Sequence, residues 1–236
     1  MLRTIKGILP QKFKIFFKKL RKFNAYHNLD KQLLEYVNYK NGFYIECGAN
    51  DGVNQSTTWF FEKHLNWRGI LIEPIPDVFN QLIKNRDKGN YFYNYALVSS
   101  EYNKKEIDFI YNKNDSLLAR KSPKSIPKGT VNKKNDKIIK VKTITLNKII
   151  FNYNLPRVID LFSLDVEGYE FEVLKGINFN DVKFKYILIE TNFPKKLTFF
   201  LKNKGYNFVK RLSDYNSLES PDYGDYLYRY EFMNKS

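Results

Sequence analysis

Apolar and polar positions alternate along residues 43–206 in a regular way. Runs rich in Ile, Leu, Val, Phe and Tyr are typical of strands buried on both faces. Such runs cover residues 43–47, 69–74, 91–98, 158–165 and 184–191. Between them, apolar residues at every third or fourth position predict helices at about 56–65, 77–86, 169–175 and 195–204. Strands that alternate with helices predict right-handed crossovers and a mainly parallel sheet.

The two ends of the chain follow other patterns. Residues 11–24 place apolar side chains at helical spacing with Lys on the opposite face, which predicts a basic amphipathic helix. A second helix is expected at 29–39. Two runs at 206–212 and 225–232 predict a terminal antiparallel strand pair. The expected fold class is therefore α/β, with a Rossmann-like, doubly wound, mostly parallel sheet and a C-terminal antiparallel strand pair.

After the third strand, the alternation is interrupted by polar, Lys- and Asn-rich sequence. Strands are expected there at 107–111 and 138–146, with a Lys-rich surface loop at 120–142. These patterns divide the chain into a basic helical N-terminal extension, residues 1–40, and one main domain, residues 41–236.

The charge of the chain is concentrated in two segments. The formal net charge of the 236 residues is +15, which suggests an anionic partner. Residues 1–22 and 120–142 each carry +8, so the rest of the chain is close to neutral, at −1. Only eight of the 40 basic residues are Arg, the residue that reads nucleic-acid bases by bidentate hydrogen bonds. The charge therefore indicates little about chemistry in the main domain.

The single cysteine, Cys47, excludes an internal disulfide and a zinc site built from cysteines. It is typical of a reducing compartment. No apolar run approaches the ~18 residues of a membrane-spanning helix. Lys6 and Pro10 interrupt the apolar residues at the N-terminus, so we expect no signal peptide and a cytoplasmic protein.

Three predicted strands end in acids, at Glu46, Glu73 and Asp165. Ligands of doubly wound sheets bind beyond the carboxyl ends of the strands. The first strand is followed by a tight turn from Gly48 to Gly52, where the backbone can approach a ligand closely. Glu73 lies 21 residues after Gly52, near the ~20-residue offset at which an acid meets a ribose diol. The spacing predicts a nucleoside site.

The turn also limits which nucleoside is expected. Asn50 stands where a dinucleotide-binding turn has its second glycine, so a pyrophosphate would be poorly accommodated. A nucleoside without phosphate suits an acid-rich pocket better, and S-adenosylmethionine is the common candidate. The chain has no G-x-x-x-x-G-K-[ST] sequence, so nucleoside triphosphate hydrolysis is not expected.

Three motifs stand in order at these strand ends: FYIECGANDG at 43–52, GILIEP at 69–74 and LDVEGYE at 164–170. Together they resemble the FkbM-type methyltransferases, a class I, S-adenosylmethionine-dependent family. The resemblance runs from about Leu29 to Phe232. The chain departs from the family pattern at Ser56-Thr57-Thr58, where Ser-Asn-Thr is frequent, and in its residues 120–142.

The resemblance implies the class I methyltransferase fold and a set of cofactor-binding residues. The methionine part of the cofactor is expected beside Glu46, Gly48, Ala49, Asn50, Asp51 and Gly52. The ribose hydroxyls are expected at Glu73 and Pro74, and the adenine near Asn94 and Ala96. Asp165 is expected to face the cofactor or the methyl acceptor.

The resemblance also implies methyl transfer to a hydroxyl, often of a sugar or a secondary metabolite. An alcohol needs a base or a metal to become nucleophilic. We therefore expect Asp165 or Glu167 to be the catalytic base, acting directly or by holding a divalent cation through its oxygen atoms. No dedicated metal-binding residues are assigned.

Some of these acids also have a structural interpretation. Glu46 could cap the turn that follows it, and Glu167 could belong to an ion pair at the strand end. We interpret Glu170 as a first-turn acid that supports the helix dipole. Neither His27 nor His64 has the sequence context of a catalytic base.

The leading hypothesis is an O-methyltransferase acting on a sugar, glycan or small metabolite. One alternative is a nucleic-acid methyltransferase attracted by the Lys-rich segments, but the Asp/Asn-Pro-Pro-aromatic signature is absent. Another is a non-catalytic, membrane-associated scaffold that retains the fold. The helix at 11–24 either docks on the main domain or lies on an anionic membrane as a peripheral contact. Oligomeric state cannot be predicted.

Overall fold

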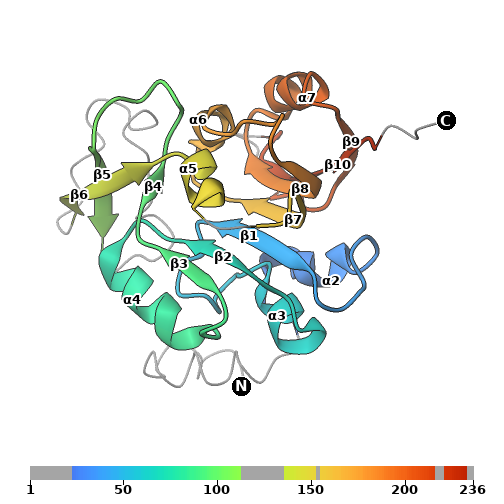
Figure 1. Ribbon diagram of the computed structural model, residues 1–236, viewed down its shortest axis with the longest axis horizontal. Coiled ribbons are helices and arrows are strands. Elements are labelled where there is room, and N and C mark those ends of the chain that lie inside the picture. The colour runs from blue at the N-terminus through green and yellow to red at the C-terminus, as the bar shows by residue number, and fades with distance from the viewer. Residues whose placement is uncertain (1–22, 113–135, 153–154, 216–220, 233–236) are drawn as a thin grey trace.

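The structure, a computed structural model, describes residues 23–112, 136–152, 155–215 and 221–232 (Figure 1). Its centre is a seven-stranded sheet in the order β3-β2-β1-β7-β8-β10-β9. The strands are β1 Phe43–Cys47, β2 Arg68–Ile72, β3 Tyr91–Tyr93, β7 Val158–Leu164, β8 Lys183–Thr191, β9 Tyr206–Arg211 and β10 Gly224–Tyr230. The first five run parallel, and β10 is antiparallel to both β8 and β9. The predicted fold class is confirmed.

Helices cover both faces of this sheet (Figure 1). On one face lie α2 Leu29–Leu33, α3 Trp59–Leu65 and α4 Pro76–Asn85, which bury Leu33, Phe61 and Leu82 in one cluster. On the other face lie α5 Leu146–Phe151, α6 Glu170–Lys175 and α7 Pro194–Lys202, which bury Leu146, Leu174 and Leu201. Burial of each such side chain contributes ~1.5–3 kcal/mol. Two apolar layers therefore hold the sheet in place.

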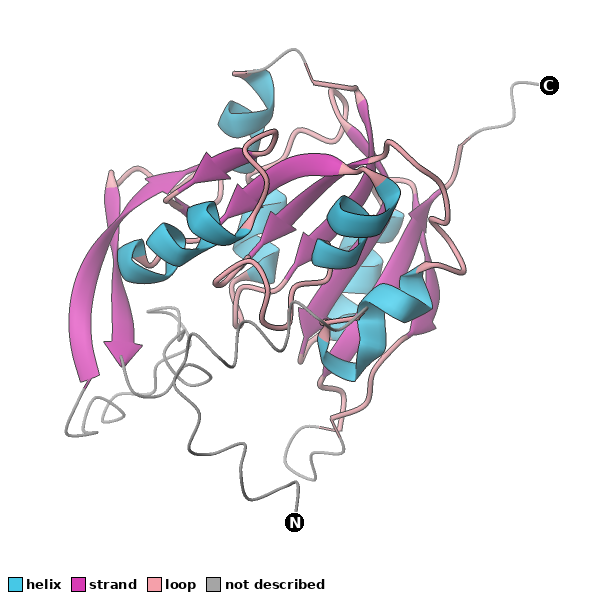
Figure 2. Cartoon of the chain, turned by 90° about the horizontal axis from the view of Figure 1, so that it is seen from below, coloured by secondary structure: helices cyan, strands magenta, loops and turns pink. Residues whose placement is uncertain are grey.

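A second, three-stranded sheet has the order β4-β6-β5, with β4 Ala96–Leu97, β5 Glu106–Asn112 and β6 Asp136–Ile144. Its long antiparallel hairpin stands at one end of the molecule (Figure 2). The single strand predicted at 91–98 is wrong, because the chain leaves the main sheet at Asn94. The Asn94 side-chain amide donates to the carbonyl oxygens of Glu73 and Pro74, at 2.8 and 2.9 Å.

Three other predicted elements differ from the structure. The helix expected at 29–39 ends at Leu33 and continues as turns to residue 36. The strand expected at 138–146 ends at Ile144, and α5 follows with Thr145 as its cap, which the sequence analysis missed. The predicted loop 120–142 is too long, because residues from Asp136 onward belong to β6; residues 113–135 lie outside the described residues.

The helix predicted at 11–24 falls almost wholly outside the described residues. Phe23 and Asn24, which are described, are not helical. The Phe23 ring stacks on Phe60 of α3 at a centroid distance of 4.7 Å, and the Asp30 carboxylate accepts from the backbone N–H of Asn24 at 2.8 Å. The chain is thus joined to the main domain from residue 23 onward. Within the described residues, no helix has the length and apolar character to cross a membrane.

Candidate active site

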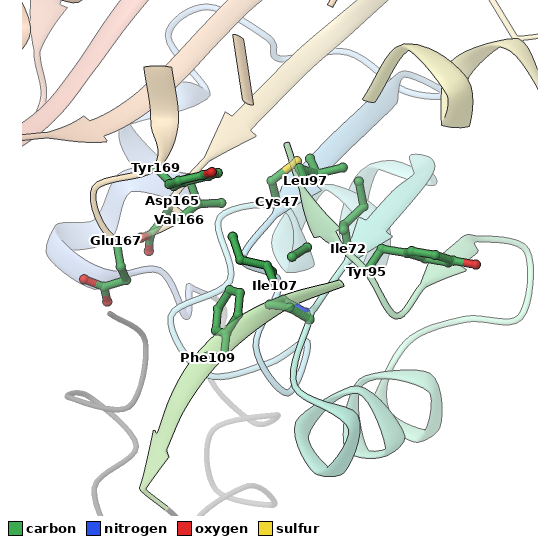
Figure 3. Close-up of a pocket in the computed structure, with 13 residues that line it drawn as sticks. Cys47, Ile72, Tyr95, Leu97, Ile107, Phe109, Asp165, Val166, Glu167 and Tyr169 are labelled. Carbon is green, nitrogen blue, oxygen red and sulfur yellow. The ribbon is translucent and has the colours of Figure 1, made fainter. Parts of the chain in front are cut away.

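A pocket lies beyond the carboxyl ends of β1, β2 and β7 (Figure 3). Five of the predicted site residues line it: Gly48, Pro74, Ala96, Asp165 and Glu167. The sequence analysis missed most of its apolar wall, including Ile72, Tyr95, Ile107, Phe109 and Tyr169. The pocket combines apolar surfaces with a carboxylate end, which suits a nucleoside that carries a positive charge.

Part of this wall comes from the segment that interrupts the strand–helix alternation. Ile107 and Phe109 of β5 lie between the Glu167 end of the pocket and Tyr95 (Figure 3). Ile107 is buried in a small cluster with Tyr169, against which Val166 and Phe109 also pack. The hairpin is therefore a wall of the site as well as a surface elaboration.

The turn after β1 takes a conformation that most residues avoid. Gly48, Asn50 and Gly52 have φ angles of 77°, 51° and 79°, in the left-handed region. The N–H groups of Gly48 and Ala49 both donate to the Ile72 carbonyl oxygen at 3.0 Å. Glycine adopts this region readily, whereas Asn50 does so at a cost that its surroundings offset. The turn is thus fixed to the end of β2, beside the pocket.

Glu73 also holds this turn. Its side chain is fully buried, and its two carboxylate oxygens accept from the N–H groups of Asn50 and Ile75, each at 3.0 Å. Glu73 does not line the pocket, so its predicted contact with a ribose stays a prediction. What the structure establishes is that Glu73 links the end of β2 to the turn after β1.

Glu46 is buried on the other side of the turn. Its carboxylate accepts from the hydroxyls of Ser56 and Thr58 and from the N–H of Thr57, at 2.6–3.1 Å. These three residues therefore bind Glu46 in place of starting a helix, and α3 begins only at Trp59. None of these donors belongs to the Gly48–Gly52 turn. Glu46 is absent from the pocket wall, and its predicted contact with a cofactor stays a prediction.

Arg86, which the sequence analysis missed, is the buried cation of this region. It donates to the Glu62 carboxylate at 2.7 Å and reaches that of Glu46 at 3.4 Å. It also donates to the Tyr44 hydroxyl at 2.7 Å and to the Gly52 carbonyl oxygen at 3.2 Å. Arg86 pairs with two buried glutamates, Glu46 and Glu62, and Lys63 also lies 3.0 Å from the Glu62 carboxylate.

Asp51 does not point its carboxylate at the pocket. The Oδ1 atom accepts from the N–H groups of Val53 and Asn54, at 2.9 and 2.7 Å. Its backbone carbonyl oxygen accepts from the Asn85 side chain at 2.8 Å. The predicted residues Ala49, Asn50, Asp51, Gly52 and Asn94 do not line the pocket, and their contacts with a cofactor stay predictions.

Asp165 and Glu167 stand on the loop after β7. The Asp165 N–H donates to the Cys47 carbonyl oxygen at 3.1 Å, which joins this loop to the end of β1. Glu167 has a φ of 55°, and Gly168 one of 93°. A non-glycine residue in the left-handed region is uncommon and costs of order 1–3 kcal/mol. The loop therefore holds Glu167 in a strained conformation beside the pocket.

Further acids lie on the neighbouring strands. Ile189 is paired with Leu164, and Glu190 with Asp225, so Asp165, Glu190 and Asp225 stand at the ends of adjacent strands. The Tyr215 hydroxyl lies 2.7 Å from Glu190 and 3.2 Å from Asp225. Burial raises the pKa of Asp225 to about 6, and the Glu190 charge adds to this effect.

Glu170 is a buried acid and does not behave as a simple first-turn acid. Backbone hydrogen bonds, foremost from the Gly168 N–H at 2.7 Å, favour its charged form. Burial, with repulsion from Glu190, raises its pKa to about 7. The sequence could not indicate this, because the burial arises from the packing of α6 on β8.

Neither a metal site nor a histidine base is found beside the pocket. Within the described parts of the chain, no group of three or more His, Cys, Asp or Glu side chains is arranged to hold a metal ion. His64 packs against Phe60 at a centroid distance of 4.8 Å, and His27 against Tyr215 at the same distance. Among the residues that line the pocket, Asp165 and Glu167 are thus the acids available as bases.

Comparison with known proteins agrees with this geometry. The model of the methyltransferase FkbM domain matches residues 46–208, more than half of the chain. No curated protein sequence matches the chain.

Several solved structures align with most of the chain. The methyltransferase FkbM of Methylobacillus flagellatus KT is 11% identical with a TM-score of 0.50, covering 83% of this chain and 45% of its own. A precorrin-6y C5,15-methyltransferase from Geobacter metallireducens GS-15 is 10% identical, with a TM-score of 0.45 over 87% and 88% of the two chains. A methyltransferase from Geobacter sulfurreducens is 12% identical, with a TM-score of 0.45 over 97% and 94%.

At such identities, the first of these structures supports the fold alone. This chain spans 45% of the length of that Methylobacillus protein. The match of the domain model covers the glycine turn, the buried Glu46 and Glu73, and the Asp165 loop. The chain therefore belongs to the FkbM family of methyltransferases, a class I family that uses S-adenosylmethionine.

Proposed function

We propose that this protein transfers a methyl group to a hydroxyl of a sugar, a glycan or a small metabolite. One observation carries the proposal: the pocket sets apolar walls suited to a nucleoside directly beside two carboxylates, Asp165 and Glu167. A hydroxyl acceptor needs a base within reach, and these carboxylates supply one.

The residues present fit S-adenosylmethionine. Ile72, Pro74 and Tyr95 offer flat or apolar surfaces to an adenosine, and Gly48 leaves room for the backbone to approach it. Asp165 and Glu167 favour a positive charge at the other end of the pocket. When bound, the cofactor supplies an activated methyl group on a positively charged sulfur.

The chain itself has three tasks in this reaction. Ile107, Phe109 and Tyr169 exclude water from the pocket and limit how the acceptor can lie. Asp165 or Glu167 takes the proton from the acceptor hydroxyl as its oxygen becomes nucleophilic. The Cys47 carbonyl oxygen, which accepts from the Asp165 N–H, keeps that loop in register with the glycine turn.

The single cysteine, buried in β1, fits a reducing compartment, and we propose the cytoplasm as the place of reaction.

The assay that tests the function uses S-adenosylmethionine with a labelled methyl group and a panel of glycans, nucleotide sugars and small alcohols. We expect label in an ether that resists hydrolysis by mild base. Label found only in nucleic acid, or on acceptor nitrogen, would contradict the proposal.

A further inference from the structure

Two consecutive residues at the end of α4 hold two consecutive carbonyl groups of the glycine turn. The Asn85 side-chain amide donates to the Asp51 carbonyl oxygen at 2.8 Å. The Arg86 guanidinium donates to the Gly52 carbonyl oxygen at 3.2 Å. Asn85 and Arg86 lie outside the family motifs. Each follows the turn residue that it contacts by 34 positions.

The residue that starts the connection from β2 to α4 also holds the turn. Glu73, just before α4, accepts from the Asn50 N–H at 3.0 Å. The segment from Glu73 to Arg86 therefore binds three groups of the turn: the Asn50 N–H and the carbonyl oxygens of Asp51 and Gly52. Asn50 is the non-glycine residue of the Gly48–Gly52 turn with a positive φ angle, 51°, so its backbone in particular depends on such external support.

The Arg86 side chain is the centre of a buried polar network. Buried ion pairs are frequently replaceable by apolar residues without loss of stability, whereas their geometry can specify one conformation. The Arg86 side chain is completely buried and makes hydrogen bonds to Glu62, to the Tyr44 hydroxyl and to the hydroxyls of Ser56 and Thr58. These contacts hold the guanidinium that also donates to the Gly52 carbonyl oxygen.

We propose that Asn85 and Arg86 are positioning residues for the cofactor. They hold the carbonyl groups of Asp51 and Gly52 toward α4, so that the rest of the turn faces the pocket in one conformation. This inference rests on the expected placement of the methionine part of the cofactor against the turn. Neither residue touches the cofactor, and neither is a catalytic residue.

Asn85 gives the cleanest test, because its side chain is only partly buried and its loss leaves the Asp51 carbonyl oxygen accessible to water. Gln81→Ala is the matched control: it removes an exposed amide one turn earlier in α4, and that amide donates to the Asp77 carbonyl oxygen of its own helix. The two ligands are S-adenosylhomocysteine, which has the amino-acid part, and 5′-methylthioadenosine, which lacks it. Calorimetry gives the Kd of each.

We expect Asn85→Ala to raise the Kd of S-adenosylhomocysteine about tenfold and to leave that of 5′-methylthioadenosine within about twofold. Asn85→Asp, which sets a carboxylate against the Asp51 carbonyl oxygen, should weaken binding further. Arg86→Lys should change the two Kd values in the same direction as Asn85→Ala, because an ammonium group cannot replace the guanidinium fork. The melting temperature of Asn85→Ala should fall by no more than about 4 °C.

An unchanged Kd for S-adenosylhomocysteine in Asn85→Ala would overturn the proposal. So would an equal loss for both ligands, since that indicates a general disturbance of the pocket. Failure of the unaltered chain to bind either ligand would instead overturn the cofactor assignment, and the positioning role with it.

Discussion

The Arg86 guanidinium donates to the Gly52 carbonyl oxygen although the two residues are 34 positions apart. The contact joins the end of α4 to the turn after β1, and the same side chain neutralises the buried carboxylates of Glu46 and Glu62. The glycine turn and the buried charges beside it are therefore joined to the end of α4 by one residue.

Replacing Arg86 by Met should strongly destabilise the fold. The substitution leaves the buried Glu46 carboxylate without its cation and leaves Glu62 with Lys63, at 3.0 Å, as its remaining partner, which together costs about 3–5 kcal/mol. Denaturant unfolding followed by circular dichroism measures the change. Combining Arg86→Met with Glu46→Gln and Glu62→Gln should restore much of the loss, because the uncompensated charges are then removed. A triple variant no more stable than Arg86→Met would show that charge pairing is not the cause.

Replacing Gly52 by Ala should also destabilise the protein, for a steric reason. A Cβ atom at this position would lie 2.7 Å from both Arg86 Cγ and Leu82 Cδ1, and the φ of 79° disfavours any side chain. Together these effects should cost about 2–4 kcal/mol. Gly89→Ala is the control, because no atom lies within 4 Å of its Cβ position, and it should change stability by less than about 0.5 kcal/mol. Equal effects at both glycines would contradict this account of the turn.

Glu170 should make the stability of the protein fall as pH rises. Burial raises its pKa from 4.5 to about 7, so the folded state favours the protonated form. That contribution is complete below about pH 4.5 and is lost as pH rises through 7. Glu170→Gln should therefore be more stable than the unaltered protein at pH 8, by up to about 3 kcal/mol, and equally stable near pH 4.

Urea unfolding at the two pH values measures this difference. Glu35→Gln removes a negative charge from an exposed position and serves as the control. A stability difference for Glu170→Gln that is the same at both pH values would contradict the raised pKa.

The fold and the pocket could be predicted to different extents. Strands such as β1 and β8 contain short apolar runs, at 43–45 and 186–189, which carry a strong signal because central strands are covered on both faces. The break between β3 and β4 left no such signal, since it depends on the Asn94 amide reaching the carbonyl oxygens of Glu73 and Pro74. Long-range contacts of this kind are invisible to local periodicity.

The same reason explains which site residues were found. The Gly48–Gly52 turn and Asp165 belong to short motifs, so their roles could be expected from sequence. Ile107 and Phe109 enter the pocket only through the placement of a hairpin, and Arg86 meets its partners only in the folded chain. Glu46 is the opposite case. Its motif suggests a cofactor contact, whereas in the structure its carboxylate contacts Ser56, Thr57, Thr58 and Arg86.

The most direct test of the account is single-turnover methyl transfer from labelled S-adenosylmethionine to a hydroxyl acceptor identified from the panel. It compares the unaltered protein with Asp165→Asn, Glu167→Gln and the double variant, and calorimetry with S-adenosylhomocysteine serves as the control for cofactor binding. We predict that at least one single variant loses about 100-fold or more in rate while it still binds S-adenosylhomocysteine. Full turnover in the double variant would contradict the assignment of the base and, with it, the proposed mechanism of hydroxyl methylation.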